Sequence, residues 1–145
     1  MKNNERLSRG WTQQPVEYIL PGNWKVVVGR TDADNDYLSL KVAAADDWWF
    51  HVRGMPGSHV VLKCPAGEEP DKQTLKKAAA IAAYHSKARG GGIVAVSCTR
   101  ARHVTKPRGA KPGTVRIRKE VVLKVRPGTG DAVLQEMKNS GGDGV

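Results

Sequence analysis

The sequence predicts a single α/β (α+β) domain with a mostly antiparallel sheet, one long alanine-rich helix packed on it and a second, short helix. Runs of alternating apolar and polar residues, typical of half-buried strands, recur between Pro/Gly turns. One alanine-rich segment has instead the composition of a helix. At 145 residues the chain can bury a core without disulfides or a metal. We expect the ordered domain over residues 15–128, between a flexible N-terminal segment, 1–14, and a C-terminal tail, 129–145.

A β-hairpin and the short helix are expected first. Residues 16–20 and 24–29 have the pattern of two strands joined by a Pro-Gly-Asn turn. Thr31 or Asp32 then offers an N-cap, and the spacing of the apolar residues that follow predicts an amphipathic helix ending before Asp46.

The segment DDWWFHVRGMPGSHVVLK, residues 46–63, predicts the central hairpin of the sheet. At period two its first strand separates into an apolar set, Trp48, Phe50 and Val52, and a mixed set, Trp49, His51 and Arg53. A loop over the five residues 54–58 predicts the pairs Arg53–His59, His51–Val61 and Trp49–Lys63 on the mixed side. That side would expose an indole, two imidazoles and two cations, which suit a polyanion with flat bases. The alternative for Trp49 is burial in the core against a helix.

The long helix and the remaining strands are expected in the second half of the chain. Asp71 is an N-cap candidate, and the alanine-rich run predicts a helix over 72–89 that ends at three glycines. Residues 93–97 are too short and too β-branched for another helix and predict an interior strand. A basic loop over 100–113 precedes a segment, 114–126, in which apolar and basic residues alternate. From residue 127 onward we expect a short helix and then a disordered tail.

The charge of the chain predicts an acidic partner. The formal net charge is +10 at pH 7, and the isoelectric point is about 9.9. Between Arg100 and Arg126 there are ten cations and one anion, Glu120, whereas the rest of the chain is nearly neutral. Such segregation favours a dedicated surface for nucleic acid first and for a membrane second. A solvated basic face without a ligand is the alternative.

Cysteine usage and the N-terminal residues indicate the compartment. Cys64 and Cys98 are isolated within or beside apolar runs, which predicts buried free thiols in a reducing cytosol. The start, MKNNERLSRGW, lacks the apolar core of a signal peptide, and no apolar run approaches the length of a membrane span. We therefore expect a cytoplasmic protein without membrane association.

Catalytic and metal chemistry have little support in the sequence. There is no Gly-Lys-Ser/Thr that would mark a phosphate-cradling loop. Only His51 and His59 are expected to be close, and no carboxylate or cysteine completes a metal-binding spacing with them. As an alternative, these two imidazoles could cleave a phosphodiester as general base and acid, with Arg53 or Lys63 stabilising the phosphorane. We expect no cofactor, no metal and no catalytic residue.

Four motifs in the chain resemble the NFACT-R (NFACT RNA-binding) domain family. They are Gly29-Arg30 with Asn35-Asp36-Tyr37-Leu38, then Asp47-Trp48-Trp49-Phe50-His51-Val52-Arg53, then Pro56-Gly57-Ser58-His59-Val60-Val61, and last Lys106-Pro107-Arg108-Gly109-Ala110-Lys111-Pro112-Gly113. They occur in the family's order and span about residues 26–127. The family is found at the end of ribosome-quality-control factors such as NEMF and RqcH and as a small stand-alone bacterial form, which this chain resembles.

The resemblance implies an RNA-binding module with no known catalytic activity of its own. The long relatives engage tRNA and the large ribosomal subunit with a stalled nascent chain, through further domains that cannot fit in 145 residues. We therefore expect recognition of tRNA or large-subunit rRNA in stalled-ribosome quality control or translation, without the polypeptide-tailing activity. The alternatives are an RNA-processing or tRNA-modification factor, acting directly or as the partner of a modifying enzyme, and a protein-docking module on the ribosome.

The expected RNA-binding residues come from these motifs and from the basic segment that follows them. Cations would contact phosphate, Trp49 or His51 would stack on or hydrogen-bond a nucleotide, and Ser58 with His59 would shape the turn. The full set is Arg30, Asn35, Trp49, His51, Arg53, Ser58, His59, Lys106, Arg108, Lys111, Arg116 and Arg118.

Overall fold

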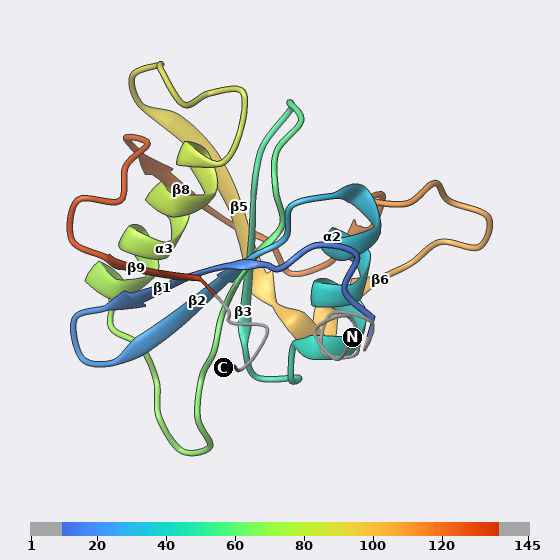
Figure 1. Ribbon diagram of the computed structural model, residues 1–145, viewed down its shortest axis with the longest axis horizontal. Coiled ribbons are helices and arrows are strands. Elements are labelled where there is room, and N and C mark those ends of the chain that lie inside the picture. The colour runs from blue at the N-terminus through green and yellow to red at the C-terminus, as the bar shows by residue number, and fades with distance from the viewer. Residues whose placement is uncertain (1–9, 137–145) are drawn as a thin grey trace, which may run out of the picture.

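Seven antiparallel strands form the sheet at the centre of the molecule (Figure 1). The computed structural model describes residues 10–136. In chain order the strands of this sheet are β1 (Val16–Leu20), β2 (Trp24–Val28), β3 (Trp48–Val52), β4 (Val60–Leu62), β5 (Val94–Arg100), β8 (Val121–Val125) and β9 (Val133–Glu136). Their order across the sheet is β8-β5-β3-β4-β2-β1-β9, and every neighbouring pair is antiparallel. The predicted α+β fold with a mostly antiparallel sheet is confirmed.

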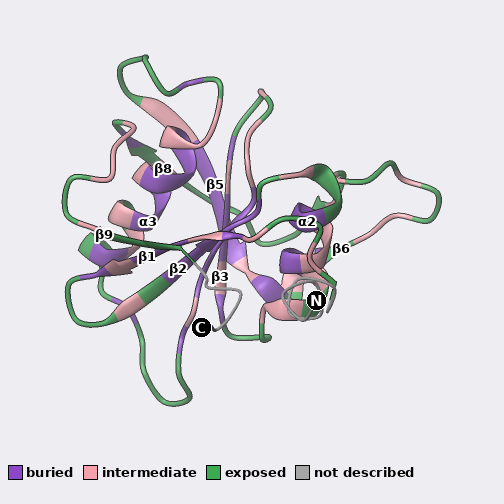
Figure 2. Ribbon diagram, in the orientation of Figure 1, coloured by how far each residue is buried: buried purple, intermediate pink, exposed green. Residues whose placement is uncertain are grey.

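Both faces of the sheet are covered. On one face lies α3 (Lys72–Tyr84). The other face carries α2 (Asp32–Tyr37), the π-helical turn η1 (Leu38–Val42) and a small second sheet of β6 (Val104–Thr105) and β7 (Arg116–Ile117), which a 3-10 turn, η2 (Ala101–His103), connects to β5. The central strands are therefore buried, as the purple segments in Figure 2 show. None of the helices between residues 10 and 136 combines the length and apolar character needed to cross a membrane.

The opening hairpin and the short helix form where the sequence predicts them. β1 and β2 pair along their whole length. The turn between them places Gly22 and Asn23 at φ values of 90° and 69°, a region that these two residue types tolerate best. The Thr31 hydroxyl accepts a hydrogen bond from the Asp34 amide at 3.0 Å, which makes Thr31 the N-cap of α2.

The long helix, α3, starts as predicted but ends earlier. The Asp71 carboxylate accepts a hydrogen bond from the Thr74 amide at 2.8 Å and is therefore the N-cap. The helix ends at Tyr84 instead of Arg89, because the His85 carbonyl is used by another loop, where it accepts the Ser58 amide at 2.9 Å.

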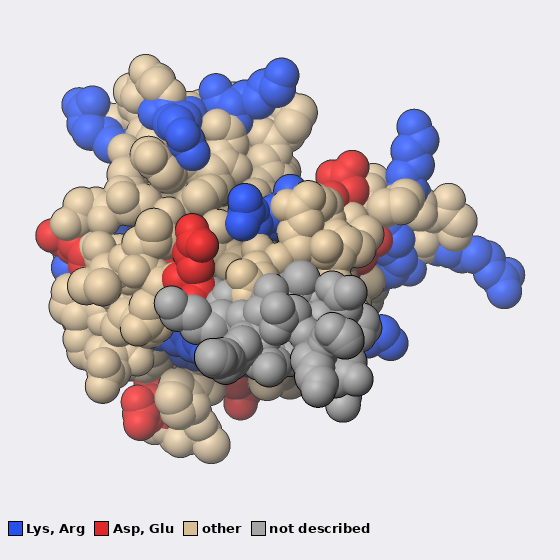
Figure 3. All heavy atoms as spheres, viewed as in Figure 1, with Lys and Arg blue, Asp and Glu red and all other residues tan. Residues whose placement is uncertain are grey.

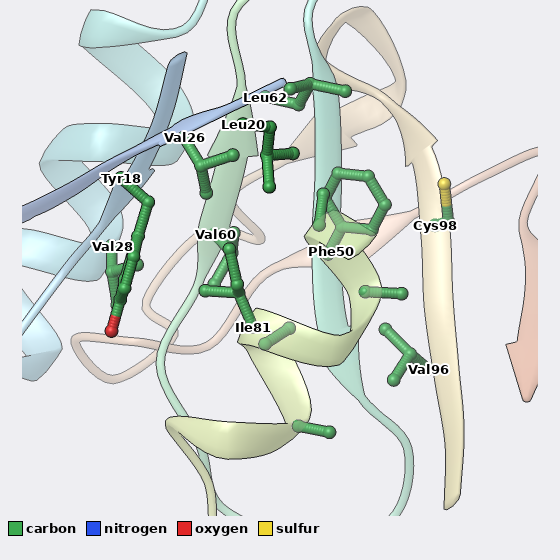
Figure 4. Close-up of a cluster of buried hydrophobic side chains, with 14 of the residues drawn as sticks. Tyr18, Leu20, Val26, Val28, Phe50, Val60, Leu62, Ile81, Val96 and Cys98 are labelled. Carbon is green, nitrogen blue, oxygen red and sulfur yellow. The ribbon is translucent and has the colours of Figure 1, made fainter. Parts of the chain in front are cut away.

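The larger core lies between α3 and the sheet (Figure 4). Alanines dominate the buried side of α3, so the helix can lie close to the strands. Ile81 from α3 joins Phe50 and Val60 in this cluster, and each is at most 1% exposed. Phe50 and Val60 are apolar positions of the predicted central hairpin. Its predicted core-facing set is confirmed for Phe50 and Val52, which are buried.

The central hairpin has the predicted faces but not the predicted register. β3 and β4 pair as Trp48–Leu62, Trp49–Val61 and Phe50–Val60. The predicted pairing, which placed Trp49 opposite Lys63, is wrong by two residues. Because two is an even number, each side chain still points to its predicted side of the sheet. The loop covers 53–59 instead of 54–58, since the His59 backbone leaves the β3 ladder and accepts the Gly29 amide at 3.1 Å.

The mixed face of β3 is buried by the second layer. Trp49 is 3% exposed and lies in a cluster with Val27, Leu38, Val61 and Val104. The expectation of an exposed indole is therefore wrong, and the alternative of Trp49 in the core is confirmed. Trp48 is half-buried, and the Arg100 guanidinium lies over its ring at 4.2 Å.

The C-terminal strands differ most from the prediction. β7 and β8 are separate strands instead of one alternating segment, because Lys119 turns the chain with a φ of 55°. β9 occupies residues 133–136 where a short helix was predicted, and that prediction is wrong. By pairing with β1 it covers an edge whose backbone groups would otherwise be open. Residues 137–145 of the predicted tail, 129–145, and residues 1–9 of the predicted flexible N-terminal segment lie outside residues 10–136, whereas residues 133–136 of that tail form β9.

The two thiols are buried and free, as predicted. Burial raises the pKa of Cys64 to about 11 and that of Cys98 to about 12. Both thiols are therefore protonated and unreactive at neutral pH.

Candidate nucleic-acid interface

A basic projection extends from the body of the protein. It consists of β6, the loop 106–115 and β7, and we call residues 106–115 the basic loop. The loop is the orange segment that extends to the right in Figure 1, and Lys and Arg side chains protrude from the same region in Figure 3. Four of the predicted cations are exposed on the projection, namely Arg108, Lys111, Arg116 and Arg118.

His59 connects the basic loop to the sheet. Its side chain is 3% exposed, and its Nε2 lies 3.1 Å from the carbonyl oxygen of Gly113. Because a carbonyl can only accept, Nε2 carries the proton and Nδ1 accepts from the Ser39 hydroxyl at 2.8 Å. The Ser39 oxygen in turn accepts from Trp49 Nε1 at 2.8 Å. Burial lowers the pKa of His59 to about 4, so the imidazole is neutral at pH 7.

Asp36 holds the same loop from the end of α2. One carboxylate oxygen accepts the Gly113 amide at 3.1 Å, and the other lies 2.9 Å from the Lys106 ammonium. Lys106 also donates to the carbonyl oxygens of Lys111 and Thr114. The Lys106 ammonium is therefore used inside the loop, where it fixes the backbone, and it is less available to a phosphate than the exposed cations are.

A cleft of about 290 Å³ lies between the C-terminal end of β3 and the basic loop. His51 and Arg53 line one side, and Val115 and Ile117 line the other. His51 is half-buried, and burial lowers its pKa, so its neutral ring can donate one hydrogen bond and accept another. Arg53 is exposed and pairs with Glu120 at 3.3 Å. Apolar walls, a neutral imidazole and a cation together suit an unstacked base and its phosphate.

Three of the predicted RNA-binding residues are buried below this surface. Trp49 and His59 belong to the hydrogen-bonded chain that holds the basic loop. Asn35 is 5% exposed, and its Oδ1 accepts the His59 amide at 3.0 Å. These side chains position the interface instead of lying on its surface.

Arg30 and Ser58 lie away from the basic loop. Both line a second cleft of about 420 Å³, together with Lys87 and Arg89. The sequence did not point to Lys87 and Arg89, because both were assigned to the end of the long helix. It also gave no signal for Ser39, whose role depends on contacts with Trp49 of β3 and with His59, both of which follow later in the chain.

The geometry does not favour cleavage by two histidines. The rings of His51 and His59 lie 5.5 Å apart, but both nitrogens of His59 are occupied by Ser39 and Gly113. A general acid and a general base each need a ring nitrogen that can reach the substrate. Among residues 10–136, no group of three or more His, Cys, Asp or Glu side chains is arranged to hold a metal ion.

Fold and site together define a small basic α+β module whose clefts are bordered by cations, a class suited to binding a polyanion. The profile of the family described as "NFACT protein RNA binding domain" matches residues 15–119. The chain belongs to this family, and the resemblance carried by the four motifs is confirmed.

Two related proteins are much longer than this chain. The Rqc2 homolog RqcH of Bacillus subtilis (strain 168) is 45% identical over 114 residues, which are 79% of this chain and 19% of that protein. The Rqc2 homolog RqcH of Streptococcus suis (strain 05ZYH33) is 38% identical over 128 residues, which are 88% of this chain and 23% of that protein. The chain thus spans about a fifth of the length of these relatives.

A solved structure has the same fold. It is the C-terminal part of the fibronectin/fibrinogen-binding protein from Streptococcus suis, at 34% sequence identity and a TM-score of 0.76. The similarity covers 90% of this chain and 52% of that one.

Proposed function

We propose that this chain binds structured RNA, either tRNA or large-subunit rRNA, in stalled-ribosome quality control or translation. The observation that carries the proposal is the basic loop with its exposed cations, which His59 and Asp36 hold on a fixed backbone. The family is described as an RNA-binding domain, and the relatives are homologs of Rqc2, the kind of factor that the four motifs resemble.

Phosphate contact is assigned to the cations of the projection. Arg108 and Lys111 lie on the loop, Arg116 lies on β7, and Arg118 directly follows β7. Each phosphate contact releases counterions, so the affinity should fall steeply with salt. Since the loop backbone is already held at Gly113, little conformational entropy is lost when RNA binds.

The cleft beside β3 is assigned to a nucleotide. The neutral His51 can hydrogen-bond a base edge, and Ile117 and Val115 supply apolar contact. Arg53 contributes less to phosphate binding than the loop cations, because Glu120 balances part of its charge.

The wider activity of the relatives is not part of the proposal. Because the chain spans about a fifth of their length, we carry over RNA binding and the ribosomal setting in the cytoplasm, and we leave out polypeptide tailing.

The proposal is tested by crosslinking the tagged protein to RNA in cells and sequencing the bound fragments. The loop variant is Arg108→Gln with Lys111→Gln. The matched control, Lys72→Gln with Lys76→Gln, removes the same number of exposed cations from α3. We expect tRNA or large-subunit rRNA to be enriched with the wild type and the control variant, and lost with the loop variant.

The same variants, with nuclease treatment of ribosomes as a second assay, distinguish RNA binding from docking on a protein. If no RNA is enriched above background, the proposed function is wrong. If the protein stays on ribosomes after nuclease treatment and the loop variant does not, the basic loop docks on a ribosomal protein.

A further inference from the structure

Two loops that are far apart in the sequence are joined at one end of the sheet. The Ser58 amide donates to the His85 carbonyl at 2.9 Å, and Gly57 and Ser86 form an antiparallel bridge. A Cβ atom at Gly57 would lie 2.7 Å from the Ser86 Cβ, so only glycine allows this approach. The Pro-Gly-Ser motif therefore holds the loop 53–59 against the segment that follows α3.

The second cleft, of about 420 Å³, lies at this junction. Its lining carries three exposed cations, Arg30, Lys87 and Arg89, and the hydroxyls of Thr31, Ser58 and Ser86. Asp32 is the one carboxylate among the lining residues. The cleft is therefore net positive and rich in hydrogen-bond donors, although it contains no residue of the basic loop.

The side chain of one cation, Arg89, and the backbone of another, Lys87, are held in position. The Arg89 guanidinium lies over the Tyr84 ring at 4.0 Å, and its Nε donates to the Tyr84 carbonyl at 2.8 Å. The backbone of Lys87 is fixed where its amide donates to the Pro56 carbonyl at 3.2 Å. A cation that is already ordered loses less entropy when it binds an anion.

The cations of the cleft contribute to a lowered pKa of His85, which is itself one of the lining residues. This ring hydrogen-bonds the Tyr18 hydroxyl at 2.7 Å. Burial, and then the charges of Arg89 and Arg30, lower the pKa of His85 to about 4. The imidazole is therefore neutral at pH 7, and the charge of the cleft comes from its arginines and lysine.

We propose that this cleft is a second RNA-binding site, which holds backbone phosphates of the same RNA that the basic loop binds. The inference rests on the proposed function. Guanidinium groups bind phosphate oxygens with paired hydrogen bonds, and the Ser58 hydroxyl can supply a further donor, whereas the Ser86 hydroxyl already donates to the Ala83 carbonyl.

The second cleft and the basic loop meet the RNA at separate points. Asp32 stands between them, because it lines the cleft and its carboxylate lies against Gly113 of the loop. Two linked contacts raise the affinity for an RNA that reaches both, since the second contact forms within the same complex. The arrangement therefore selects a folded or long RNA over a short oligonucleotide.

The test measures the binding of fluorescein-labelled unfractionated tRNA as a function of salt. The cleft variant is Arg30→Gln with Lys87→Gln, which leaves the stacked Arg89 in place. Arg30→Lys with Lys87→Arg keeps the charge, and the α3 variant Lys72→Gln with Lys76→Gln is the matched control. Two lost phosphate contacts, each worth about 0.7 to 0.9 in the salt slope, weaken binding about tenfold at roughly 0.15 M salt.

We expect this loss for the cleft variant, with near wild-type binding for the charge-preserving variant and for the α3 control. If the cleft variant binds like the α3 control while the loop variant Arg108→Gln with Lys111→Gln is weakened, the second site is wrong and the proposed function stands. If the wild type itself fails to bind tRNA and large-subunit rRNA fragments, the proposed function and this inference are both wrong.

Discussion

His59 donates a hydrogen bond from Nε2 to the carbonyl oxygen of Gly113, 54 residues further along the chain, at 3.1 Å. The same ring accepts from Ser39, and Ser39 accepts from the buried Trp49 indole. One face of the sheet therefore determines where the exposed cations of the basic loop lie. This connection explains how buried residues of the motifs support a surface that they do not form.

Removing the His59 ring should destabilise the fold and release the basic loop. His59→Ala leaves the Ser39 hydroxyl proton without its acceptor and the Gly113 carbonyl without its donor, which lowers the free energy of unfolding by about 1–3 kcal/mol. Urea unfolding measures this loss. His103→Ala, which removes a half-buried imidazole beside the same region, is the control and should change stability by less. Equal losses for the two variants would show that the His59 bonds are not the cause.

Lys106 and Lys111 should behave differently although both lie in the basic loop. Lys106→Ala breaks the ion pair with Asp36 and is expected to cost about 1–2 kcal/mol of stability, between the values for exposed and buried pairs. Lys111 is exposed, so Lys111→Ala should weaken RNA binding and leave stability unchanged.

A double-mutant cycle with Asp36→Asn checks this assignment of Lys106. The two stability losses should be less than additive, because each change removes the same ion pair. Fully additive losses would mean that the pair does not stabilise the loop.

Gly57→Ala should open the junction between the two loops. The added methyl group meets the Ser86 side chain at 2.7 Å, and relief of this clash requires a backbone shift that costs about 1–3 kcal/mol. Gly92→Ala is the control, since a Cβ at Gly92 meets no atom within 4 Å. Unfolding midpoints compare the two variants. If Gly57→Ala is as stable as Gly92→Ala, the close contact between Gly57 and Ser86 does not contribute to the stability of the fold.

Stability should fall when the pH is lowered from 7 to 5. His59 and His85 have pKa values lowered to about 4 in the folded protein, against an ordinary value of 6.5. Between about pH 6.5 and pH 4 the unfolded chain binds more protons, so their stabilising effect is complete above this window and is lost as the pH falls through it. Urea unfolding at several pH values should show a shallower loss for His85→Gln. If the wild type and His85→Gln lost the same amount of stability between pH 7 and pH 5, protonation of His85 would not be a cause of the loss.

The alternation of apolar and polar residues predicted most of the sheet, because it fixes which side chains share a face. It did not fix the register between β3 and β4. The Pro/Gly positions suggested a short loop, but the backbones of Ser58 and His59 are bound to His85 and Gly29 instead. The four-residue strand β9 was missed because nothing local distinguishes it; its pairing with β1 forms across the chain.

The positions of the candidate RNA-binding residues were predicted in part for a similar reason. Charge clustering located the exposed loop cations, since charged side chains rarely become buried without a partner. Polarity alone could not show that Trp49 and His59 lie beneath a second layer, or that Asn35 is buried within that layer. That layer is assembled from α2 and η1 and from β6 with β7, and residues 43–103 separate η1 from β6.

The most direct test of the central claim is the salt dependence of tRNA affinity for the wild type and for Arg108→Gln with Lys111→Gln. If the basic loop contacts phosphate, the negative slope of log affinity against log salt should become shallower by about 1.4 to 1.8 in the variant, since each contact contributes about 0.7 to 0.9 to its steepness. The α3 control Lys72→Gln with Lys76→Gln should keep the wild-type slope. Identical slopes for the wild type and the loop variant would contradict RNA binding by the basic loop.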